Sequence, residues 1–235
     1  MKKIIVTIVV IVFTLGIKAQ EKSDLDFSVG ADLVSSYVWR GQFQTGAAIQ
    51  PALALNVAGF SLSAWGSVDV LGIGKEVDFT LGYEISGISL ALTDYWWAGE
   101  GVYKYFTYDS NKTDHLFEMT AGYTLPLESF PLSLSWNTFF SGADKKLDNA
   151  GKKVQAYSTY IEATYPFFIK NIALDAAIGL TPWEGGYSAK TEVVNISLKA
   201  SKEIKLTDSF SLPAFGQIIL NPNREGIYFV FGLSL

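Results

Sequence analysis

The amino-acid sequence predicts an all-β protein: a transmembrane, antiparallel, up-and-down β-barrel of about 12 strands, preceded by a cleaved signal peptide. Three observations predict this fold. The chain is 49% hydrophobic but only 17% charged. Apolar and polar residues alternate with period 2 over most of its length, which is typical of strands with one apolar face. Most alternating segments have about nine to eleven residues, the length that a tilted strand needs to cross a bilayer.

Composition and charge exclude several kinds of site. The chain has no cysteine and one histidine, which excludes disulfide frameworks, thiolate zinc sites and iron–sulfur clusters. Its net charge of −5 argues against a nucleic-acid-binding surface, because neutralising phosphates needs a basic face. We therefore expect no cofactor, no metal site and no nucleic-acid partner.

Residues 1–19 have the pattern of a signal peptide. A basic start at Lys2 and Lys3 precedes an apolar run from Ile4 to Ile17, and Ala19 supplies the small residue that signal peptidase requires. The run is too short for a membrane anchor, which needs about 20 apolar residues. Cleavage leaves residues 20–235 as the expected barrel and, by removing three lysines and no acid, changes the net charge from −5 to −8.

The expected strands follow one another to the end of the chain, each with one apolar phase. They are residues 27–40, 48–57, 60–70, 76–85, 88–97, 115–125, 132–141, 155–165, 172–181, 193–201, 210–220 and 226–235.

The connections between these strands alternate in length. Mostly short turns are expected at 58–59, 86–87, 126–131, 166–171 and 202–209, and longer polar loops at 98–114, 142–154 and 182–192. Short periplasmic turns and long extracellular loops are typical of outer-membrane barrels. Aromatic residues near the strand ends, Tyr37 and Trp39 among them, are expected at the membrane rims.

The last strand carries a hydrophobic residue at every second position, namely Ile227, Phe229, Phe231, Leu233 and Leu235. This resembles the C-terminal β-signal of outer-membrane proteins, except that the final residue is leucine and not aromatic. The resemblance implies recognition by the barrel-assembly machinery. The alternative is the closing strand of a soluble β-sandwich.

In a barrel, the polar phase of each strand lines the lumen. The candidate lumen residues are Asp32, Arg40, Asp69, Glu76, Asp78, Glu84, Glu118, Glu162, Asp175 and Lys199, with Trp65 narrowing the pore. Eight acids against two bases favour cations, so we hypothesise a weak cation preference. Alternatively, Arg40 and Lys199 pair with inward acids and only hold the wall together.

The first strands resemble the TorF-type porin family of Gram-negative outer membranes. That family opens with S-x-Y-x-[FW]-R-G and carries W-G-S on its third strand. The matching residues are Ser35, Tyr37, Trp39, Arg40 and Gly41 for the first motif and Trp65, Gly66 and Ser67 for the second. The resemblance covers three strands and implies a barrel with a diffusion role in the outer membrane, without naming a solute.

We therefore expect a porin for small solutes or ions, in contact with outer-membrane lipid and lipopolysaccharide. The alternative is a structural or adhesive barrel that acts through its loops, for which the tyrosine-rich segment 103–108 is the supporting feature. We expect no enzymatic activity: His115 is the only histidine that could act as a general base, and the chain has no G-x-S-x-G, H-E-x-x-H or phosphate-loop motif.

Overall fold

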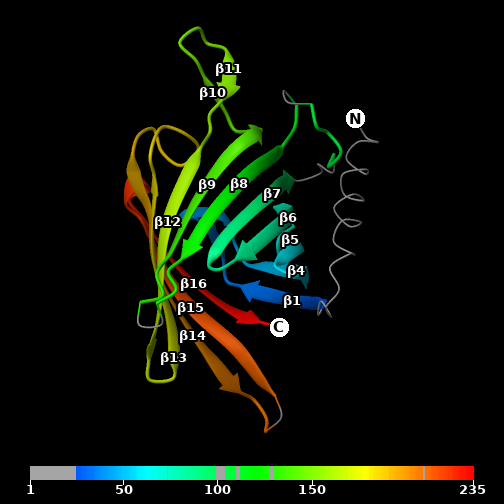
Figure 1. Ribbon diagram of the computed structural model, residues 1–235, viewed down its shortest axis with the longest axis vertical. Helices are drawn as coiled ribbons and strands as arrows, with labels where there is room; N and C mark the ends of the chain where they lie inside the picture. The colour runs from blue at the N-terminus through cyan, green and yellow to red at the C-terminus, as the bar shows by residue number, and fades with distance from the viewer. Residues whose placement is uncertain (1–24, 73, 99–103, 110–111, 128–129, 209) are drawn as a thin grey trace.

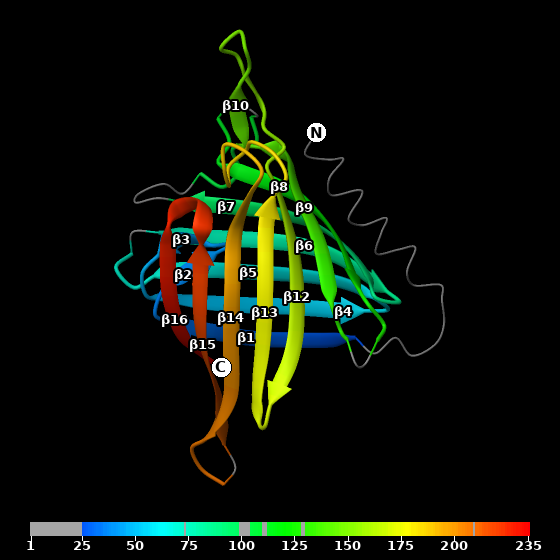
Figure 2. The same cartoon turned by 90° about the vertical axis from the view of Figure 1, so that its left-hand side faces the viewer.

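The structure is a computed structural model that describes residues 25–72, 74–98, 104–109, 112–127, 130–208 and 210–235. The expected signal peptide at 1–19 lies outside the described residues. Strands in the described residues form one closed antiparallel barrel of 12, which confirms the predicted fold class (Figures 1 and 2). The barrel strands are β1 (Asp26–Val34), β4 (Ala48–Val57), β5 (Phe60–Asp69), β6 (Lys75–Ile85), β7 (Ile88–Ala98), β8 (His115–Thr124), β9 (Ser133–Gly142), β12 (Thr159–Ile169), β13 (Ile172–Thr181), β14 (Glu192–Lys205), β15 (Ser211–Asn221) and β16 (Gly226–Ser234).

Each barrel strand pairs with its neighbours along the chain, and β1 pairs with β16 to close the sheet. This seam is short, because the strand register matches only Asp32–Val34 of β1 with Gly232–Ser234 of β16. On its other side β1 is paired with β4 along its whole length. Among the described residues, no helix is long and apolar enough to cross a membrane.

Two short hairpins and a 3-10 helix lie in the connections. β2 (Tyr37–Trp39) and β3 (Gln42–Thr45) form a hairpin between β1 and β4, and β10 (Lys145–Leu147) and β11 (Lys153–Gln155) form one between β9 and β12. The β10–β11 hairpin stands away from the barrel (Figure 1). A 3-10 helix, η2 (Pro222–Arg224), joins β15 to β16.

The two ends of the barrel differ as the sequence predicts. At one end, the turn end, Ala58-Gly59 and Ser86-Gly87 connect their strands with two residues each, all at positive φ between 49° and 83°. Such turns match the right-handed twist of a hairpin. The other end, the loop end, carries the long connections, including the β2–β3 and β10–β11 hairpins.

The residues of each barrel strand alternate between two faces. Large apolar side chains on the outward face leave much of their surface exposed, as at Val29 (67%) and Phe229 (66%). The inward face is polar and buried, for example at Gln50, Ser67 and Asn137. An apolar exterior around a polar interior is the pattern of a barrel that faces lipid.

Two predicted turns were too long. The predicted turn 166–171 is shorter because β12 continues through Pro166, and the predicted turn 202–209 is shorter because β14 runs on to Lys205, so that the β14–β15 hairpin, which contains Pro213, extends past its neighbours (Figure 2). In β12, Thr164 is the last residue that pairs with β9, and Pro166 comes after it. In β15, Ala214 is the first residue that pairs with β16, and Pro213 comes just before it. Both prolines therefore lie where the strand has lost one neighbour, a position that tolerates proline.

The predicted first strand, 27–40, was also wrong beyond Val34. The chain leaves the wall there and forms the β2–β3 hairpin, which folds into the barrel. Tyr37 and Trp39, expected at the membrane rim, therefore lie in the lumen, where Tyr37 packs on Trp65 and Trp39 on Tyr95.

Candidate functional site: a hairpin inside the lumen

The β2–β3 hairpin reverses at Arg40 and Gly41, with φ of 50° and 74°. This two-residue turn with positive φ at both positions has the geometry of the turns at the opposite end of the barrel. Glycine is required at its second position for a further reason, because a Cβ on Gly41 would collide with the backbone carbonyl oxygen of Val194 on β14. On the same side of the barrel, Asn221 donates from Nδ2 to the Gly41 carbonyl oxygen at 2.9 Å. The hairpin tip is therefore fitted against the barrel wall.

Arg40 forms the main electrostatic contact of the hairpin. Its guanidinium donates to both carboxylate oxygens of Glu118 on β8, at 2.5 and 2.8 Å, and to the hydroxyl of Tyr187 at 2.5 Å. It also lies over the rings of Trp39 (4.3 Å) and Tyr160 (4.8 Å). The side chains of Arg40 and Glu118 are 11% and 1% exposed, so the pair is almost fully removed from solvent.

The ionisation of this cluster follows from its burial. Burial alone lowers the pKa of Arg40, but Tyr187 and Glu118 oppose it and raise the pKa well above the usual value. Burial likewise raises the pKa of Tyr187, against the lowering effect of Arg40. Arg40 is therefore a permanent cation and Tyr187 a neutral phenol at any physiological pH.

Aromatic side chains extend this contact across the lumen. The ring of Trp39 lies 5.5 Å from that of Tyr95, 6.0 Å from Trp97, 6.3 Å from Phe139 and 6.1 Å from Tyr187. The hairpin reaches other parts of the wall through Tyr37, next to Trp65 on β5, and Phe43, next to Tyr228 on β16. It thus meets strands around much of the barrel and constricts the lumen near the loop end.

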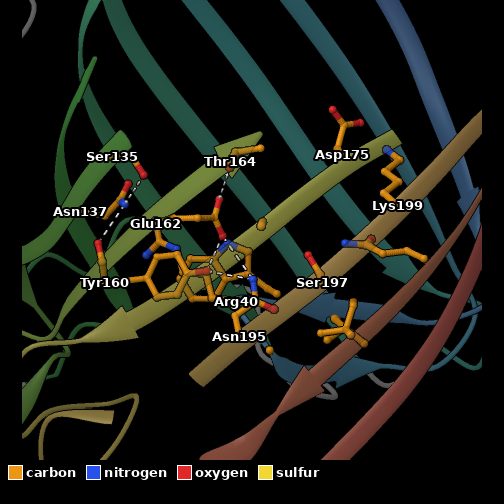
Figure 3. A pocket seen from close by; sticks show the side chains of 16 residues that line it. Arg40, Ser135, Asn137, Tyr160, Glu162, Thr164, Asp175, Asn195, Ser197 and Lys199 are labelled. Carbon is orange, nitrogen blue, oxygen red and sulfur yellow. Dashed lines mark hydrogen bonds between the residues drawn. The ribbon is translucent and has the colours of Figure 1, made fainter. Parts of the chain in front are cut away.

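A chamber of about 350 Å³ lies on the turn-end side of the hairpin tip (Figure 3). Its charged lining comes from the hairpin and from three neighbouring strands: Arg40, Glu162 on β12, Asp175 on β13 and Lys199 on β14. Glu162 accepts hydrogen bonds from Tyr160 and from Asn195. Asp175 and Lys199 are directly opposite in the strand register, and the Lys199 ammonium lies 4.2 Å from the ring centre of Phe215.

A second cavity, of about 470 Å³, lies on the loop-end side of the same constriction. Trp39 lines both this cavity and the chamber. The charges in the lining of the second cavity come from Asp144, Lys145, Lys146 and Glu184. Polar cavities therefore occur on both sides of the hairpin.

The other candidate lumen residues are spread over the wall. Asp32, Glu76, Asp78, Glu84, Glu118 and Trp65 lie on the inward phase of their strands, but only Glu118 contacts Arg40. Glu84 is exposed near the turn end. Asp69 is buried at the loop end, where it accepts a hydrogen bond from the backbone N–H of Leu71 and so stabilises the β5–β6 connection.

His115 lies on the outer side of the barrel. Its Nδ1 is 2.6 Å from Asp94, and its Nε2 is 2.5 Å from the carbonyl oxygen of Tyr105. Tyr105 also donates from its hydroxyl to Asp94 at 3.1 Å. Both ring nitrogens are thus occupied, and the fully buried histidine attaches the β7–β8 loop to the barrel wall instead of activating a hydroxyl. Tyr103 of the tyrosine-rich segment lies outside the described residues.

Sequence reasoning missed Tyr95, Tyr160, Tyr187 and Asn221, which position the hairpin. The Arg40-Gly41 dipeptide followed by the alternating residues 42–45 is a hairpin signal that could have indicated the inward turn. In the described residues, no group of three or more His, Asp or Glu side chains could hold a metal ion.

The sequence matches no protein-family model and no curated protein. Among solved structures, the chain is similar to an outer membrane channel from Pseudomonas putida F1, at 12% identity and a TM-score of 0.44, covering 92% of this chain and 98% of that one. It is also similar to Salmonella typhi OmpF in complex with daunomycin, at 8% identity and a TM-score of 0.38, covering 90% and 97%. A third similar structure is BamA from Haemophilus ducreyi lacking POTRA domains 1–3, at 10% identity and a TM-score of 0.40. The similarity covers 86% of this chain, which spans only 42% of the length of that one.

Proposed function

We propose that the chain is exported through residues 1–19 and forms an outer-membrane porin of the TorF type, in which small solutes or ions pass a constriction made by the β2–β3 hairpin. The observation that carries this proposal is the apolar outward face around a polar lumen with cavities on both sides of the hairpin. A lumen that is narrowed but lined by polar side chains suits small hydrophilic solutes. The C-terminal strand would bind the barrel-assembly machinery.

The charges support a weak preference for cations. Of the ten predicted lumen charges, Arg40 is neutralised by Glu118. Seven carboxylates then remain against Lys199 alone. An excess of carboxylates along a pore lowers the energy of a cation in it and raises that of an anion.

Planar-bilayer recording with the purified barrel in a KCl gradient tests both the porin function and the cation preference. We expect single-channel events whose reversal potential has the sign for K⁺ preference. A variant in which a Gly-Ser linker replaces residues 37–45 should conduct several-fold better, because the constriction is gone. Absence of channel events in the folded wild-type barrel contradicts the porin proposal, and a reversal potential of the opposite sign contradicts the cation preference.

The second candidate function is a structural or adhesive barrel acting through its loops. The observation that favours it is the β10–β11 hairpin, which stands away from the loop end and carries Lys145, Lys146 and Lys153 on its two strands. If neither the wild-type barrel nor the linker variant conducts, this function replaces the porin.

A further inference from the structure

A third cavity, of about 220 Å³, lies between the β2–β3 hairpin and the wall formed by β5, β6 and β7, at the loop end. Its lining is Tyr37, Gln44, Thr45, Ser67, Gly74, Lys75, Glu76 and Trp97. The hairpin fits closely here too, since a Cβ on Gly74 would lie 2.7 Å from the Thr45 methyl group.

Two acids near this cavity are buried, and three of their four carboxylate oxygens form no hydrogen bond with the part of the chain that the structure describes. Glu76 is 3% exposed, and among the described residues neither of its carboxylate oxygens forms a hydrogen bond of normal geometry, although the Tyr37 hydroxyl and the Trp97 indole lie close enough to interact with the carboxylate. Asp78, two residues further on the same inward face of β6, is 7% exposed and has one oxygen that forms no hydrogen bond with a described residue. Neither acid forms an ion pair with another described residue, in contrast to Glu118. A buried carboxylate without a partner is costly, and a cation removes that cost.

Two aromatic side chains, Tyr37 and Trp97, form part of the cavity wall, and Gln44, Thr45, Ser67 and Lys75 contribute polar groups to the rest of it. Trp97 is opposite Glu76 in the β6–β7 register and stacks on Tyr95 at 5.5 Å, and Tyr37 packs on Trp65 at 5.5 Å. Burial, with the charges of Glu76 and Asp78, raises the pKa of the Tyr37 hydroxyl, which therefore stays neutral. Aromatic faces attract cations electrostatically, most strongly where water is excluded.

We propose that this cavity, in which the carboxylate of Glu76 lies between the aromatic side chains of Tyr37 and Trp97, binds a small organic ammonium ion. An ammonium group has three donors, and the two carboxylate oxygens of Glu76 can accept from it inside the cavity. The volume corresponds to about seven water molecules, more than a bare ion fills and enough for a short alkyl group against the rings. A divalent metal fits less well, because two acids supply too few ligands. The site does not depend on conduction through the barrel.

Calorimetric titration tests the proposal with the full-length mature barrel in a non-ionic glycoside detergent, which carries no ammonium group. The probes are n-propylammonium chloride, 1-propanol as its neutral counterpart, and KCl, at constant ionic strength. We expect saturable binding of propylammonium and none of 1-propanol. Glu76→Gln, which keeps the size of the side chain, should weaken binding at least tenfold. The matched control is Glu84→Gln on the same face of β6, which should bind as the wild type does.

Several outcomes overturn the proposal: no propylammonium binding, equal binding of 1-propanol, unchanged binding in Glu76→Gln, or saturable K⁺ binding without propylammonium binding. Binding that occurs only in Lys75→Met also overturns it, because the Lys75 ammonium would then be the counter-ion of these acids. Heat-modifiable mobility on gels checks that each variant is folded. A failure of channel activity in the same preparation affects the porin proposal and leaves this one standing.

Discussion

The β2–β3 hairpin meets two walls of the barrel in different ways. On the side of β8, β12 and β14, the inward charges have partners: Arg40 binds Glu118, and Glu162 accepts from Tyr160 and Asn195. On the side of β5 and β6, Glu76 and Asp78 have carboxylate oxygens that form no hydrogen bond with any described residue. The same hairpin thus brings a cation to one wall and only aromatic and neutral polar side chains to the other. The difference separates acids that hold the fold from acids that remain available to a ligand.

Removing Arg40, the cation that pairs with Glu118, should cause the largest loss of stability. In Arg40→Met, Glu118 is left buried without its guanidinium, and such a loss costs about 3–5 kcal/mol. We expect a fall of that size in the free energy of unfolding, measured by tryptophan fluorescence in urea. The matched control is Arg224→Met, since Arg224 is the chain's other arginine and is exposed. Equal stability of the two variants would mean that the Arg40–Glu118 pair does not hold the hairpin.

The fit of the hairpin tip gives the next largest effect. Gly41→Ala and Gly151→Ala both place a side chain at φ +74°, which costs about 1–2 kcal/mol, but only at Gly41 does the new Cβ meet another strand. Around Gly151, no heavy atom lies within 4 Å of that position. We expect Gly41→Ala to lose about twice as much stability in urea and to increase single-channel conductance by displacing the hairpin. A similar result for both variants would show that the tip is not fitted to the wall.

A smaller loss is expected where the wall holds the tip by a hydrogen bond. Asn221 is fully buried, donates to the Gly41 carbonyl oxygen and accepts from the backbone N–H of Arg224. Asn221→Ala leaves these groups unpartnered at a cost of about 1–2 kcal/mol. Urea unfolding should show this loss, whereas Asn149→Ala, at an exposed position of the β10–β11 connection, should stay within about 0.5 kcal/mol of the wild type.

The smallest expected change is a gain in the free energy of unfolding, and it comes from Glu76 on the side of β5 and β6. In the absence of amines, Glu76→Gln replaces a buried carboxylate that forms no hydrogen bond with a described residue by a neutral amide, so we expect the barrel to become about 0.5–1 kcal/mol more stable. The isosteric Glu118→Gln should instead destabilise it, because Arg40 loses its counter-charge. Measured in urea side by side, the two variants sharpen the comparison, and a large destabilisation by Glu76→Gln would reveal a hidden partner.

The sequence predicted the walls of the barrel far better than its interior. Alternation is a local property, and the segments 48–57 and 172–181 have in the structure the bounds that their periodicity predicted. The path of residues 35–47 depends on contacts with β8, β14 and β16, which are distant in sequence. Tyr37 and Trp39 continue the alternation of β1, so the local pattern can indicate a turn at Arg40-Gly41 but not that the hairpin folds into the lumen.

The candidate site was predicted only in part, for the same reason. Periodicity assigned Glu76, Glu118 and Glu162 to one face but could not distinguish the acid that Arg40 reaches from the one that it does not. The motif residues Ser35, Tyr37, Trp39, Arg40 and Gly41 carry the resemblance to a porin family, and the structure supplies a physical role for them. Ser35 accepts from the backbone N–H of Phe231 at 3.0 Å, and the other four residues make the contacts of the hairpin described above.

The short seam between β1 and β16 has a consequence for assembly. The hairpin connects β1 to β4, directly beside this seam, and the seam joins residues about 200 positions apart in the chain. Contacts between such distant residues form late, because the loop entropy must be overcome first. Insertion of the hairpin and closure of the cylinder are therefore coupled in time: once the seam has formed, the bulky tip with Trp39 and Arg40 has no lateral route inward. A chain that lacks its last strand should accumulate as an open sheet with the hairpin unseated.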